Sequence, residues 1–170
     1  DGWFFTRDNL AFTVITRLLR SLAYEARYFE QCVWLLCRFA ENEKTNENNA
    51  SSTDLLCTLF HIHLSGTHAP LAMRLNIIET LLLEQRTGLA LRLLNSLLKT
   101  SHFTSFQSFD FGAQVRDFGY LPQTRNDYEG WFCRVLDFLI AIYTRHPELS
   151  RDTCGIVHSR FRSLWKIKPA

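Results

Sequence analysis

Apolar residues recur every three to four positions along most of the chain, and this spacing limits the fold more than any other feature of the sequence. Such spacing places apolar side chains on one face of a helix. It predicts seven helices, at about residues 9–24, 26–41, 53–65, 70–85, 89–98, 127–146 and 150–166. The 170 residues include only 7 glycines and 4 prolines, which argues against turn-rich sandwiches and barrels. The predicted fold class is therefore all-α.

The predicted helices also suggest how the chain is organised. They fall into the pairs one and two, three and four, five with a long connection, and six and seven, at intervals of roughly 35 to 45 residues, which is typical of HEAT-like or TPR-like units. No residue-level repeat accompanies this interval. We therefore expect residues 1–170 to form a single helical domain, a helix-pair α-solenoid-like array of about seven helices, with a compact helical bundle as the alternative. Because the sequence starts at Asp1, we expect it to be a fragment of a larger chain.

Two segments interrupt the helical pattern. Residues 42–53 contain a single apolar residue, Ala50, and are expected to form a flexible polar loop. Residues 101–124 lack helical periodicity but keep six aromatic side chains: Phe103, Phe106, Phe109, Phe111, Phe118 and Tyr120. Disordered loops are poor in aromatic residues. We therefore expect 101–124 to be an ordered loop that packs over a helix surface.

The aromatic loop contains the triplet Asp-Phe-Gly twice, at 110–112 and 117–119. In a protein kinase this triplet binds magnesium, but the chain lacks the other kinase motifs. We interpret the triplets as structural, with Gly112 and Gly119 permitting a positive φ and an arginine fixing the loop. The candidate residues for fixing the loop or contacting a partner are Arg116, Asp117, Tyr120 and Arg125.

The sequence does not carry a recognisable catalytic motif. A phosphate-binding G-x-x-x-x-G-K-[ST] loop, a G-x-S-x-G elbow and a nucleophile flanked by a base are all missing. Potential metal ligands cluster only at Cys57, His61, His63 and His68, and His61 and His63 point to opposite sides of a helix. We therefore expect neither enzyme activity, nor a cofactor, nor a metal.

The cysteines and the charges bear on location and partners. Five cysteines without a C-x-x-C pair are typical of buried free thiols in a reducing compartment, which predicts the cytoplasm. Nineteen basic and 17 acidic residues leave a formal charge of +2, which disfavours a nucleic-acid partner. No apolar stretch is long enough to span a membrane. Arginine outnumbers lysine 15 to 4, which suits either fixed contacts between helices or a recognition surface for a protein.

Several short strings resemble the helical region of large bacterial STAND NTPases and antiviral-defence proteins. The resemblance begins in Arg17 to Glu41, with R-L-L-R-S-L-A-Y, then Y-F, then L-L-C-R-F-A-E. It continues through Leu55–Phe60, Gly66-Thr67, Arg74-Leu75, Leu81-Leu82, Leu91–Leu98 and the loop from Phe111 to Tyr120. It covers roughly residues 10 to 145 and rests mostly on packing residues.

In proteins of that kind, an effector and an NTPase module precede a helical array that senses the invader or supports assembly. The resemblance therefore implies a non-catalytic sensor or protein-interaction segment of a bacterial antiphage defence protein. Its expected partner is a phage protein or another domain or subunit of the same assembly. A purely structural helical spacer between effector and NTPase domains is the alternative.

Overall fold

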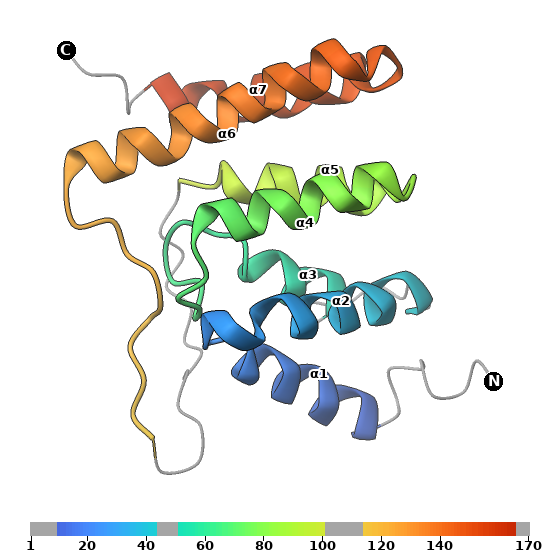
Figure 1. Ribbon diagram of the computed structural model, residues 1–170, viewed down its shortest axis with the longest axis vertical. Helices are drawn as coiled ribbons and strands as arrows, with labels where there is room; N and C mark the ends of the chain where they lie inside the picture. Colours follow the sequence, from blue (N-terminus) through green and yellow to red (C-terminus); the bar gives the residue numbers. More distant parts are fainter. Residues whose placement is uncertain (1–9, 44–50, 101–113, 166–170) are drawn as a thin grey trace.

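The computed structural model describes residues 10–43, 51–100 and 114–165, and its described part is all-α, as predicted (Figure 1). The α-helices are α1 (Leu10–Leu22), α2 (Ala26–Asn42), α3 (Ser52–Thr58), α4 (Leu71–Leu83), α5 (Thr87–Leu97), α6 (Arg125–Arg145) and α7 (Ser150–Trp165), and a 3-10 turn, η1 (Pro147–Leu149), precedes α7. None of these helices combines the length and apolar character that crossing a membrane requires.

The helices are stacked in pairs along one axis. Helix α2 packs on α3, α4 on α5 and α6 on α7, and the pairs meet through contacts of α3 with α5, α5 with α7 and α4 with α6. Helix α1 packs on α2 and α3 and covers one end of the stack, while α6 and α7 form the other end (Figure 1). One continuous hydrophobic core runs from α1 to α7. This arrangement is the helix-pair array expected from the sequence.

The pairing of the helices differs from the predicted one. The fourth helix was expected to pair with the third, but α4 packs on α5 instead. The physical reason is the tight connection between them, where Gln85 adopts a φ of 61° and reverses the chain within three residues. Thr87 and Gly88, which lie between the predicted helices 70–85 and 89–98, already belong to α5.

Helix α3 is also shorter than its apolar pattern predicts. It ends at Thr58, and the next amides, of Leu59 and Phe60, bond to carbonyls two or three positions back. Leu59, Phe60 and Ile62 are all fully buried. Because these neighbouring positions point in different directions on a helix, burying all three requires the chain to leave the helical path. Residues 59–70 therefore form a buried connection to α4.

The structure describes only parts of the two predicted loops. Within 42–53, Ser51 caps α3 by accepting a hydrogen bond from the Asp54 amide, and the Ser52 amide donates to Glu43 at 2.7 Å. Residues 44–50 and 101–113 lie outside the described residues. The second of these ranges includes the first Asp-Phe-Gly triplet with Gly112.

The prediction that all cysteines are buried was wrong for two of them. Cys32 and Cys37 are buried in the core, and burial raises the pKa of Cys37 to about 12. In contrast, Cys133 and Cys154 are exposed on α6 and α7. Their helices were predicted correctly, but Cys133 and Cys154 lie on sides of α6 and α7 that the core does not cover.

Candidate functional site

The described part of the aromatic loop, residues 114–124, runs as an extended segment across the ends of the stacked helices and leads into α6 (Figure 1). We call residues 114–124 the strap. Thr124 ends the strap and forms a capping box with Asp127 at the start of α6. Two short backbone segments lie under the strap, the corner between α1 and α2 and the residues that precede α4.

Backbone hydrogen bonds join the strap to the segment before α4. The Gly66 amide donates to the Phe118 carbonyl at 2.9 Å, and the Tyr120 amide donates to the Thr67 carbonyl at 2.7 Å. Between them, Gly119 has a φ of 82°, the positive value anticipated from the sequence. A Cβ atom at Gly119 would overlap the backbone of Thr67. Position 119 therefore requires glycine for two reasons, the positive φ and the close approach of two backbones.

Asp117 is the polar centre of the strap. Its Oδ1 atom accepts hydrogen bonds from the Tyr24 hydroxyl at 3.1 Å and the Gly119 amide at 2.8 Å, and lies 3.0 Å from His68 Nε2. Partial desolvation raises the pKa of Asp117, but the Gly119 and Tyr24 hydrogen bonds and nearby His68 outweigh it, so the pKa lies below its usual value. The carboxylate thus joins the strap to both segments beneath it.

Two other predicted residues, Arg116 and Tyr120, also bind the strap to the helices. Arg116 donates to the Ser21 carbonyl at the end of α1 at 2.5 Å, and its guanidinium lies 4.5 Å from the centre of the Tyr24 ring. Tyr120 stacks on Trp131 of α6 with the ring centres 5.4 Å apart. The structure therefore brings Arg116, Asp117 and Tyr120 into one segment.

Arg125, the fourth predicted residue, lies apart from this group. Its Nε atom is 2.7 Å from Glu129 Oε1, one turn further along α6, and its side chain is largely exposed. Other arginines join separate elements. Arg86, in the connection between α4 and α5, donates to both carboxylate oxygens of Glu41 of α2. Similarly, Arg160 of α7 donates to Asn95 of α5 at 2.8 Å.

Sequence reasoning missed the arginine that supports the site from inside. Arg74 of α4 is fully buried, and no carboxylate lies within ion-pair distance of it in the described part of the chain. It donates twice to the Ala69 carbonyl, at 3.2 and 3.0 Å, and to the His61 carbonyl at 2.7 Å. Its guanidinium also lies 5.1 Å from the centre of the Trp131 ring. The available signal was an arginine one turn after Leu71, on the apolar face of α4.

Burial lowers the pKa of Arg74 to about 9, so the group stays charged at neutral pH. Its partners are backbone carbonyls of the segment between α3 and α4, the same segment whose residues 66 and 67 pair with the strap. Arg74 therefore fixes the surface on which the strap lies.

The outer surface of the strap carries three exposed apolar side chains. The side chains of Val115, Phe118 and Leu121 are 93%, 56% and 47% exposed. Large apolar side chains exposed on a fixed backbone are typical of surfaces that bind another protein. Phe118 was expected to pack over a helix surface with the rest of the aromatic loop, but its side chain is exposed.

The potential metal ligands near the strap do not form a metal site. Within the described residues, no group of three or more histidine, cysteine, aspartate or glutamate side chains is placed to hold an ion. His68 instead contacts Asp117 and the Tyr24 hydroxyl. His61 lies among basic groups, and desolvation, followed by Lys99, Arg74, Arg160 and Arg20, lowers its pKa to about 3.

We predict that His61 makes the protein less stable in acid. The unfolded chain binds a proton at His61 near pH 6.5, whereas the folded protein binds it only near pH 3, so stability falls as the pH drops between these values. The slope from this residue is at most about 1.4 kcal/mol per pH unit. Urea unfolding at a series of pH values measures it. The His61→Gln variant is expected to flatten the dependence, and an unchanged slope would contradict the prediction.

Comparisons with protein-family models, with curated proteins and with solved structures found no match to this chain.

Proposed function

We propose that the chain is a non-catalytic helical module that binds a protein partner through the outer surface of the strap. The observation that carries the proposal is the exposure of Val115, Phe118 and Leu121 on a backbone held by Arg116 and Asp117. A surface that is already ordered loses little conformational entropy on binding. Its apolar side chains then contribute most of their burial energy to the affinity.

The biological setting of the proposal rests on the resemblance to bacterial STAND NTPases and antiviral-defence proteins. We place the module in a cytoplasmic antiphage defence protein, where it senses a phage protein or contacts another part of the same assembly. The formal charge of +2 favours a protein partner over a nucleic acid.

A structural spacer is the second candidate, and the polar contacts of the strap favour it. Arg116 and Asp117 bond to groups of the same chain, and Arg125 pairs with Glu129 on its own helix. In this alternative the strap only seals the ends of the helix pairs, and its exposed side chains bind nothing.

A double variant in the parent protein distinguishes the two functions. We expect Val115→Asp with Leu121→Asp to abolish protection of cells against phage without changing the melting temperature, because both side chains are exposed. Leu83→Asp is the matched control, since Leu83 is 73% exposed at the far end of α4. If the double variant still protects cells fully against phage, the result favours the function of a structural spacer.

Removing the two side chains that hold the strap, Arg116 and Asp117, tests the same surface in a different way. We expect Arg116→Ala with Asp117→Ala to lower the free energy of unfolding by no more than about 2 kcal/mol, because both groups are partly solvated. The strap should nevertheless become sensitive to proteolysis, and protection against phage should fall with it. Lost protection without new cleavage in the strap would mean that Arg116 or Asp117 contacts the partner directly.

A further inference from the structure

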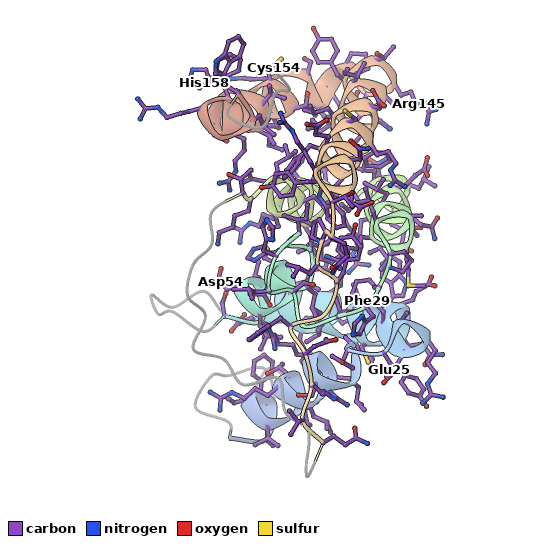
Figure 2. The ribbon with its side chains drawn as sticks, turned by 90° about the vertical axis from the view of Figure 1, so that its left-hand side faces the viewer. Glu25, Phe29, Asp54, Arg145, Cys154 and His158 are labelled. Carbon is purple, nitrogen blue, oxygen red and sulfur yellow. The ribbon has the colours of Figure 1, made fainter. Side chains whose placement is uncertain are left out.

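The open end of the helix stack carries a second apolar surface, separate from the strap. A groove of about 520 Å³ runs between α6 and α7, and its lining residues are Leu136, Leu139, Ile140, Tyr143, Thr153, Cys154, Val157 and His158. Figure 2 shows Cys154 and His158 at this end of the molecule. Along the same helices, Ile140, Tyr143, Phe161 and Trp165 are each at least half exposed. We call this surface the end face.

The stack itself indicates what kind of surface covers the end face. The pair of α4 and α5 is covered on one side by the pair of α6 and α7, through the contacts of α4 with α6 and α5 with α7. An antiparallel helix pair of this chain is therefore a fitting cover for another such pair. A second copy of the chain supplies a pair with the same groove.

The charges on the end face are distributed unevenly. Helical spacing places Arg151, His158 and Arg162 in one row on α7, and His158 of this row lines the apolar groove. The corresponding row on α6 contains Cys133, Asp137 and Thr144, with no basic residue. A partner that lies across the groove therefore binds most tightly when its acidic side contacts α7.

We propose that the end face of one molecule docks on the end face of a second copy, around a twofold axis that runs along the groove between α6 and α7. This axis places α6 of each copy over α7 of the other and brings the row of Asp137 on one chain against the row of His158 and Arg162 on the other. A twofold axis perpendicular to the two helices would instead place the basic row of α7 over the same basic row of the second copy. The charges therefore select the first arrangement.

The oligomeric state of the 170-residue protein tests the proposal, and sedimentation velocity over a wide concentration range measures it. We expect a reversible dimer. Tyr143→Glu is expected to weaken the dimer at least about tenfold, because it places a charge in the apolar groove. Leu35→Glu, at an exposed position on α2, is the matched control and should leave the dimer unchanged. Circular dichroism melting verifies that each variant folds.

A charge reversal tests the axis. Asp137→Arg is expected to weaken the dimer about fivefold, and adding Arg162→Asp should restore the lost affinity. A monomer at every concentration would overturn the proposal. A dimer that Tyr143→Glu leaves unchanged would also overturn it, and a dimer that the Asp137 variant strengthens would overturn the axis.

The two exposed cysteines give an independent measure of the axis. Cys154 lines the groove, so the two copies of this residue face each other across the axis, whereas Cys133 lies on the outer side of α6. A short bismaleimide crosslinker should join the dimer through Cys154. Crosslinking should be lost in Cys154→Ser and kept in Cys133→Ser, and the reverse pattern would exclude this axis. Because the strap lies on other elements, a failure here leaves the proposed function intact.

Discussion

Replacing Arg74 with alanine is expected to lower the free energy of unfolding by about 3 to 5 kcal/mol, because two carbonyls lose their donor and the removed side chain leaves a cavity. The variant leaves the buried carbonyl of Ala69 and the partly buried carbonyl of His61 without their donor. It also opens a cavity beside Trp131. Urea unfolding followed by circular dichroism measures the loss.

Two further variants separate the causes of that loss. Arg74→Met fills the space but donates no hydrogen bond, so we expect it to recover only the part of the loss that comes from the cavity. Arg74→Lys keeps the charge but loses the forked guanidinium, which donates hydrogen bonds to two carbonyls at once. A loss below about 1 kcal/mol in the alanine variant would show that the carbonyls find other donors.

The Gly119→Ala variant is expected to release the strap from the helix ends. Alanine at a φ of 82° costs about 1 to 2 kcal/mol, and its Cβ atom would overlap the Thr67 backbone, so both flanking backbone hydrogen bonds should be lost. We expect a total loss of about 2 to 4 kcal/mol and rapid proteolysis within residues 114–124. A thermal melt and limited proteolysis measure the two effects.

Gly155→Ala is the matched control for this substitution. Gly155 lies inside α7, and a Cβ atom built there meets no other atom within 4 Å. Alanine should therefore stabilise the protein by up to about 1 kcal/mol, because it favours the helix. If Gly119→Ala were as harmless as this control, the close approach of the strap to Thr67 would be wrong.

The helices were predictable because their signal is local. In α6, for example, Phe132, Val135 and Leu139 are buried and lie on the stripe read from the sequence. The early end of α3 was not predictable, because it depends on burial of Leu59, Phe60 and Ile62 on several sides at once. A periodic pattern describes one face of a helix and carries no information about a segment buried all around.

Three residues of the candidate site were predictable from the sequence, but their partners were not. Arg116, Asp117 and Tyr120 were identified from the loop that contains them, together with a positive φ at Gly119. Their partners come from distant parts of the chain, since Tyr24 and Asp117 are 93 positions apart. The number of possible pairings over such separations is large, and only the packed fold selects one of them.

The role of Arg74 was not predictable for a related reason. An arginine on an apolar helix face either reaches solvent or requires buried acceptors. Here the acceptors are the carbonyls of His61 and Ala69, which exist as a group only because residues 59–70 leave the helical path.

Hydrogen exchange of the native protein tests most directly whether the strap is a fixed surface, on which both the site and the proposed function depend. The amides of Gly66 and Tyr120 form the two backbone hydrogen bonds between the strap and the segment before α4. We expect both amides to exchange far more slowly than in an unfolded chain. Exchange of the Tyr120 amide at the rate of an unfolded chain, with the core amides still protected, would contradict the account.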